Sequence, residues 1–132
     1  MPHPVSDQLA ERIESLFGHS RDDLDAHNAT TDRPTMLAAL LDGLATIEQA
    51  EKNIEFQRER LVELAAPGRD IGPAAAGHLL DCSRRIAESV ATRDAQTRFA
   101  AAVIQSLYRP LAPAATPVAQ TPTLTASTVR TR

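Results

Sequence analysis

The chain contains no tryptophan, and aromatic residues are scarce: one tyrosine and three phenylalanines among 132 residues. It holds 23 alanines instead. Alanine-rich helices pack closely, but each small side chain removes little apolar area from water, whereas a fully buried large aliphatic residue contributes about 1.5–3 kcal/mol. Because ordering the backbone costs about 1–2 kcal/mol per residue, a monomer is predicted to be marginally stable, and self-association would add stability.

Cysteine and long apolar runs are also lacking. Cys82 is the only cysteine, which excludes an intrachain disulfide. No basic N-terminal region precedes an apolar run, and no apolar stretch approaches the roughly 18 residues of a membrane span. The sequence therefore predicts a cytoplasmic protein that does not contact a membrane.

The motifs of common enzyme and metal sites are missing as well. The sequence has no CxxC, HExxH, Glu-x-x-His or GxSxG motif and no glycine-rich phosphate loop. His78 and Cys82 stand one helical turn apart, but two ligands do not make a metal site. Cys82 shares an apolar stripe with Leu79 and Ile86, so we predict that its small side chain is buried. From the missing motifs we predict no catalytic activity and no cofactor.

An acidic stretch near the N-terminus has the alternating ligands of a calcium loop. Counted from Asp23, however, the sixth residue is Asn28 instead of glycine and the twelfth is Pro34 instead of glutamate. Residues 19–33 are therefore predicted to form a polar connection with one helical turn, which Ser20 and Asp23 would start as a capping pair. The rejected ligand set is His19, Asp22, Asp23, Asp25 and His27.

The net charge of −3 is unevenly distributed. Residues 1–70 carry 14 acidic and seven basic side chains, whereas residues 71–132 carry three acidic and seven basic ones. We interpret this as pairing between the two halves of one chain, with a separate charged partner as the alternative. The arginines point to scattered directions on an ideal helix, so no phosphate-binding stripe and no nucleic-acid partner are predicted.

The stretch from Pro34 to Ala65 has the strongest pattern in the sequence. Leu40, Ile47, Ile54 and Leu61 recur every seven residues without an internal proline, which predicts one long helix. It should begin between residues 32 and 35, with Asp32 as a cap and Pro34 in the first turn, and should stop at residues 67–68.

Two further helices are predicted around this one. Residues 5–17 form a short amphipathic helix that Ser6 would cap and Gly18 would end. Residues 73–109 form a second long helix after a breaker-rich connection, and this helix either continues through the polar segment 92–98 or bends there. The short connection requires an antiparallel hairpin. The expected fold is all-α, a long antiparallel helical hairpin and a short N-terminal helix forming a three-helix bundle in residues 1–109, followed by a disordered Pro/Thr/Ala-rich tail in residues 110–132.

Two parts of the central helix are candidates for contact with another molecule. Antiparallel pairing places the polar segment 92–98 opposite residues 40–46, so the wide apolar surface from Met36 to Ile47 needs another cover, either the first helix or a second copy. Phe56 lies about 200° around the helix from Ile54 among polar residues. The candidate interface is Met36, Leu37, Leu40, Leu41, Leu44 and Phe56.

A ridge of like charge borders the same helix, formed by Glu51, Glu55, Glu59 and Glu63 at intervals of four. Such a ridge needs nearby cations. Together these features predict a non-catalytic helical module for protein–protein interaction or assembly, which self-associates as a homo-oligomer or binds a helical protein. The alternative is a small-ligand-binding or regulatory bundle with a cavity near Met36–Ile47.

Overall fold

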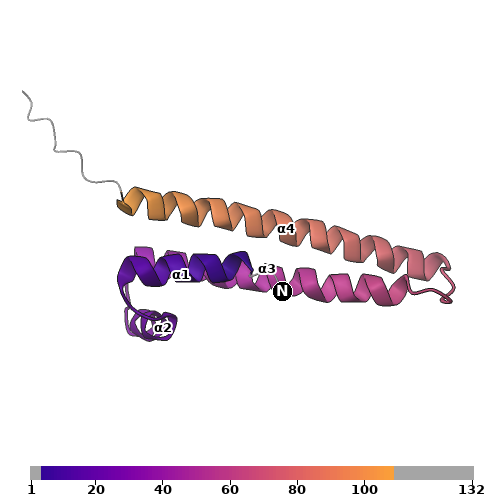
Figure 1. Ribbon diagram of the computed structural model, residues 1–132, viewed down its shortest axis with the longest axis horizontal. Helices are drawn as coiled ribbons and strands as arrows, with labels where there is room; N and C mark the ends of the chain where they lie inside the picture. Colours follow the sequence, from indigo (N-terminus) through magenta and orange to yellow (C-terminus); the bar gives the residue numbers. More distant parts are fainter. Residues whose placement is uncertain (1–3, 109–132) are drawn as a thin grey trace, which may run out of the picture.

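The computed structural model describes residues 4–108, and all of their regular structure is helical. Four helices follow one another: α1 (Val5–Phe17), α2 (Arg21–Ala29), α3 (Met36–Leu64) and α4 (Pro73–Tyr108) (Figure 1). No strand occurs within residues 4–108. The all-α prediction is confirmed, whereas the predicted tail, residues 110–132, lies outside the described residues.

The two long helices form the predicted antiparallel hairpin (Figure 1). Residues 65–72 connect them, and Gly68 adopts a φ of 84°, which glycine tolerates without steric cost. α4 is one uninterrupted helix through the polar segment 92–98. Gln96 Oε1 lies 3.5 Å from the place where a Cβ on Gly43 would stand, so this segment does face the first half of α3.

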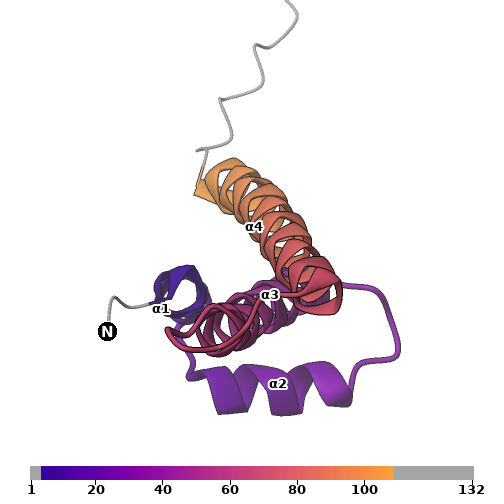
Figure 2. The same ribbon diagram turned by 90° about the vertical axis from the view of Figure 1, so that its right-hand side faces the viewer.

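α1 covers the first half of the hairpin and runs antiparallel to α3. Its first turn contacts Glu51 through Ser6, and its last residue, Phe17, lies beside Met36 and Leu37. Figure 2 views the long helices end-on, with α1 on one side of α3 and α2 running across. The buried residues of this half form one cluster: Leu9, Ile13, Leu24, Leu37, Leu40, Leu41, Leu44, Ile47, Ala100 and Ile104.

The prediction of three helices was wrong in one respect, because residues 21–29 form a helix of their own. Ser20 caps it as predicted, accepting a hydrogen bond from the Asp23 amide at 3.3 Å. Leu24 reaches the core, and Arg21 donates to Glu48 of α3 at 2.8 Å, a bond that raises the pKa of Arg21. Leu24 is the one buried residue of α2, and the rest of its sequence is mostly polar. The apolar periodicity of residues 21–29 is therefore too weak to predict the length of this helix.

The starts of α1 and α3 also differ from prediction. Ser6 lies inside α1, whose N-cap is Pro4 without a side-chain bond, and Glu51 of α3 accepts hydrogen bonds from both the Ser6 amide and its hydroxyl. The cap of α3 is Thr35, which accepts from the Ala38 amide at 3.0 Å, so Asp32 and Pro34 precede the helix. A carboxylate from another helix thus does the capping that we assigned to Ser6.

Gly18 ends α1 as predicted, with a φ of 71° and its amide bonded to the Glu14 carbonyl at 2.8 Å. This left-handed residue turns the chain sharply toward α2. The connection is held further by Glu14, whose side chain accepts from the Arg21 amide at 3.1 Å.

Candidate functional site

The predicted interface residues separate into two groups in the structure. Leu37, Leu40, Leu41 and Leu44 are buried in the chain's own core, under α1, α2 and the end of α4. Only Met36 (47% exposed) and Phe56 (62% exposed) are available at the surface. The first helix therefore supplies the cover that we expected for this zone, and the leucines present no surface to a partner in this conformation.

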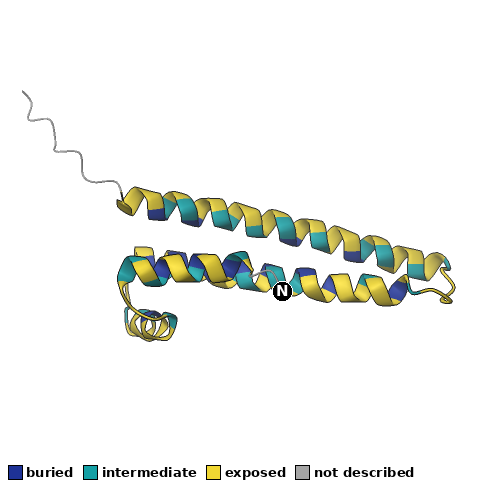
Figure 3. Ribbon diagram, in the orientation of Figure 1, coloured by how far each residue is buried: buried dark blue, intermediate teal, exposed yellow. Residues whose placement is uncertain are grey.

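Past the N-terminal end of α1, the described residues 4–108 place no third helix beside the hairpin, and more of its surface is exposed (Figure 3). The stripe of α3 that α1 covers runs through Leu44, Ile47 and Glu51, and at helical spacing it continues through Ile54, Arg58 and Val62. On α4 the corresponding stripe contains Leu79, Ile86 and Val90. We name the continued surface the distal face: Ile54, Arg58, Leu61, Val62, Leu79, Ile86 and Val90.

The distal face exposes one large apolar side chain that sequence reasoning did not single out. Val62 is 69% exposed, while Leu61, Leu79, Ile86 and Val90 are partly exposed. The α4 stripe of Leu79, Ile86 and Val90 contains no charged residue, whereas the exposed Leu80 lies about 100° around the helix from Leu79 and one turn before Arg84. The charged residues of that segment lie on another stripe and pair with each other: Arg84 with Asp81 at 2.7 Å and with Glu88 at 2.8 Å, and Arg85 with Asp81 at 2.8 Å.

A groove of about 890 Å³ opens between the first turn of α1 and the start of the distal face. Pro4 and Val5 of α1, Ile54 and Arg58 of α3, and Arg93 of α4 are among its lining residues. The groove is therefore the uncovered continuation of the channel in which α1 lies.

The glutamate ridge is divided between structural and surface roles. Glu51 binds Ser6, Glu55 pairs with Arg58 at 3.4 Å, and Glu63 pairs with Arg60 at 3.1 Å. Between Pro4 and Tyr108, no ion pair joins α3 to α4. The opposite charges of the two halves are thus not matched by direct contacts within the part of the chain that the structure describes.

Replacing Glu51 by alanine is expected to lower the free energy of unfolding by about 1–3 kcal/mol, because the Ser6 amide and hydroxyl lose their acceptor. Ser6 is buried, so water replaces that acceptor poorly. Urea unfolding followed by circular dichroism measures the change. Glu55→Ala removes an exposed ion pair and should change stability by less than about 1 kcal/mol; equal effects of the two substitutions would contradict the capping role.

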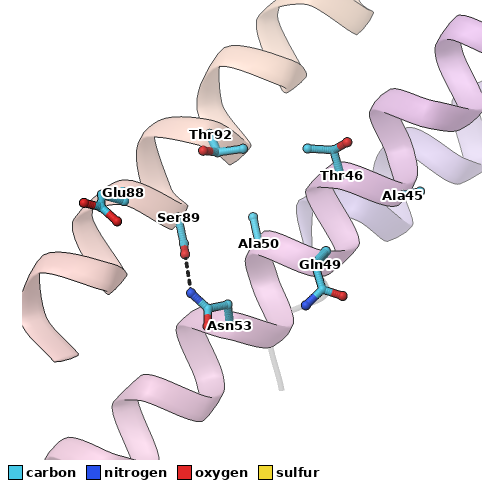
Figure 4. Close-up of a pocket in the computed structure, with 8 residues that line it drawn as sticks. All are labelled: Ala45, Thr46, Gln49, Ala50, Asn53, Glu88, Ser89 and Thr92. Carbon is cyan, nitrogen blue, oxygen red and sulfur yellow. Dashed lines mark hydrogen bonds between the residues drawn. The ribbon is translucent and has the colours of Figure 1, made fainter. Parts of the chain in front are cut away.

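The opposite flank of the hairpin carries a shallow polar groove of about 560 Å³ (Figure 4). Asn53 Nδ2 donates to Ser89 Oγ at 2.6 Å across the helices, and Gln57 is buried beside this pair and donates to Asn53 Oδ1 at 3.5 Å. Thr46 and Thr92 face the groove from the two helices. A buried polar pair of this kind fixes the register in which two helices pack.

The exposed charge network of α4 is expected to make stability depend on pH. Hydrogen bonds from Arg84 and Arg85 lower the pKa of Asp81. A carboxyl whose pKa is lower in the folded chain stabilises the fold above its unfolded pKa of about 4, and this stabilisation is lost as the pH falls through the folded value. Asp81→Asn should therefore lower the thermal midpoint at neutral pH and leave it unchanged under strongly acidic conditions.

Salt provides the control for this prediction, because charges this exposed are screened at about 1 M ionic strength. The difference between Asp81→Asn and the original chain should disappear in that buffer. A difference that persists in high salt would show that Asp81 acts through packing instead of charge.

The structure places the candidate metal residues apart. Cys82 is buried, as predicted, whereas His78 is exposed. The acidic cluster at residues 19–27 forms the N-cap and body of α2. Within residues 4–108, no group of three or more histidine, cysteine, aspartate or glutamate side chains could hold a metal ion.

No protein-family model, curated protein or solved structure matches this chain. In the described part of the chain, no helix combines the length and the apolar character that crossing a bilayer requires.

Proposed function

We propose that this chain is a non-catalytic helical module for protein–protein interaction, that it self-associates, and that the distal face is its main contact surface. One observation carries the proposal: the hairpin extends well past α1 and exposes Val62 beside the partly exposed Leu61, Leu79, Ile86 and Val90, on the flank that α1 covers elsewhere. Contiguous exposed apolar surface of this kind is typical of interaction sites in soluble proteins.

The rest of the molecule supports this assignment. α1 shows that the channel between α3 and α4 accepts an amphipathic helix, because Leu9 and Ile13 are buried in it. The cytoplasmic location predicted from the sequence is part of the same proposal, since the lone cysteine is buried and unpaired.

The test is a pull-down with the full chain as bait, compared with a matched bait carrying Val62→Glu. The Val62 side chain is mostly exposed, so the substitution should leave the helical circular dichroism spectrum unchanged. The proposal requires captured protein, either added copies of this chain or another protein, that the substituted bait loses. Equal capture by both baits would contradict it.

A second candidate function, binding of a small molecule, is supported by a cavity of about 630 Å³ between α1, α2 and the start of α3. Phe17, Leu24, Met36 and Leu37 form its apolar part. Its polar lining consists of His19, Asp23, His27, Asn28, Thr31 and Thr35. Its volume falls in the range of about 300–1,000 Å³ that is typical of ligand pockets.

The methyl group of Met36 provides a probe for this cavity. Small aromatic compounds that enter it should shift the Met36 methyl signal in nuclear magnetic resonance spectra, and Thr31→Phe should block the shift by filling the space. Shifts that persist in Thr31→Phe, or no shift with any compound, would exclude this function.

A further inference from the structure

The cavity between α1, α2 and the start of α3 has a lining of one charge sign. Asp23 is the lining residue that carries a full charge when histidine is counted as neutral. Among the described residues that line the cavity, none is lysine or arginine. Arg33 lies on the segment between Thr31 and Thr35, but it is exposed and does not line the cavity. The cavity is therefore negatively charged at neutral pH.

The charge of Asp23 is not neutralised within the fold. Two other acidic side chains near α2, Asp25 and Glu48, pair with Arg21 at 3.1 Å and 2.8 Å. Arg21 does not line the cavity. Between Pro4 and Tyr108, the Asp23 carboxylate has no ion pair. It is therefore available to a positively charged ligand.

The start of α2 offers little to an anion, although a helix N-terminus commonly binds one. The Arg21 amide already donates to the Glu14 carboxylate at 3.1 Å. The Asp23 and Leu24 amides donate to the hydroxyl and the carbonyl of Ser20 at 3.3 Å and 3.0 Å. Three of the first four amide groups of α2 are thus occupied, and an anion in the cavity would also be repelled by Asp23.

The uncharged polar side chains of the cavity add hydrogen-bond acceptors. The Thr31 hydroxyl donates to the His27 carbonyl at 3.0 Å, which leaves its oxygen able to accept. Asn28 is partly buried and has a side-chain oxygen that can accept. An ammonium group has three donors and no acceptor. It therefore matches this lining better than a carboxylate or a phosphate does.

The remainder of the lining suits an apolar body attached to such a cation. Leu24 and Leu37 are buried, and Met36 and Phe17 complete this part of the cavity. An apolar group that enters here leaves water, which favours binding. The Phe17 ring also attracts cations at its face.

We infer that this cavity binds a small organic cation, in which an ammonium group is attached to an aromatic or aliphatic body and Asp23 is its counter-ion. The inference rests on the second candidate function and names its ligand class. Asp23 is exposed, so the attraction is that of a charge pair in water, which favours binding about fivefold at a separation of about 4 Å.

Three probes with the same phenyl ring and two-carbon spacer test this inference: 2-phenylethylammonium, 2-phenylethanol and 3-phenylpropionate. Each is titrated into the full chain at about pH 8, where histidine is uncharged, and its affinity is read from the Met36 methyl signal. The cation should bind about fivefold tighter than the alcohol, and the anion should bind more weakly than either.

Asp23→Asn should reduce the affinity for the cation to that for the alcohol and leave the affinity for the alcohol unchanged. Asp22→Asn is the matched control, because it removes the same charge from the first turn of α2 but at a side chain that does not line the cavity. This variant should keep the preference for the cation. Circular dichroism should show both variants as helical as the original chain.

The remaining outcomes separate this inference from small-molecule binding itself. If the alcohol binds and Thr31→Phe blocks it, but the cation binds no tighter or the anion binds best, the ligand class is wrong and the binding function stands. A preference for the cation that survives Asp23→Asn would overturn the role of Asp23. If none of the three probes shifts the Met36 signal, both the inference and the second candidate function are overturned.

Discussion

Replacing Leu44 by alanine is expected to lower the free energy of unfolding by about 2–5 kcal/mol. Leu44 is completely buried where α3 meets the core cluster, so the substitution leaves a cavity. For a domain with the usual total stability of about 5–15 kcal/mol, a loss of this size is a large fraction of the whole. Urea unfolding monitored by circular dichroism measures the effect.

Phe56→Ala is the control for this substitution. It removes a larger side chain from the same helix, but that side chain is mostly exposed, so the expected change in the monomer is within about 0.5 kcal/mol. If both substitutions cost the same, the assignment of Leu44 to the core and of Phe56 to the surface would be wrong.

Replacing Ile13 by aspartate is expected to have the second large effect, at least about 3 kcal/mol. Ile13 is 1% exposed, and the substitution both removes its packing and places a carboxylate among apolar side chains. Hydrogen exchange with mass spectrometry should show α1 losing protection first, because α1 has fewer contacts with the hairpin than α3 and α4 have with each other.

Glu11→Ala provides the matched control on the exposed side of α1, with an expected change close to zero. Unchanged protection of α1 in Ile13→Asp would show that α1 is held by the Ser6–Glu51 contact instead of its apolar stripe.

The hairpin could be predicted from sequence because two local signals agreed. Leu40, Ile47 and Ile54 recur every seven residues, which indicated a long helix. The short, breaker-rich connection before Pro73 indicated that the next helix runs antiparallel to it. Gly18 and Ser20 were also predictable, since a left-handed glycine and a serine cap act through their own neighbours in sequence.

Other features depend on contacts between distant residues, which a single sequence does not reveal. Ser6 has the chemistry of a cap, yet Glu51 performs the capping because α1 begins beside it. Leu24 anchors α2 although its neighbours are polar. The burial of Leu41 and Leu44 follows from three helices meeting at one place.

The distal face could not be predicted for the same reason, because it depends on how far α1 reaches along the hairpin. Val62 follows ordinary helical spacing, and nothing in its local sequence says where α1 begins. Its exposure results from the difference in length between α1 and the hairpin. The one available signal was the difference in length between the predicted helix 5–17 and the two long helices, compared along the predicted antiparallel register.

The placement of α1 against both α3 and α4 also has a consequence for synthesis of the chain. α1 leaves the ribosome before α3 and α4, but the residues that cover it include Ala100 and Ile104, about 90 residues later. At about 5–20 residues per second, α1 waits several seconds for the last part of its binding channel. During that interval its stripe of Leu9 and Ile13 is open to any other apolar surface nearby.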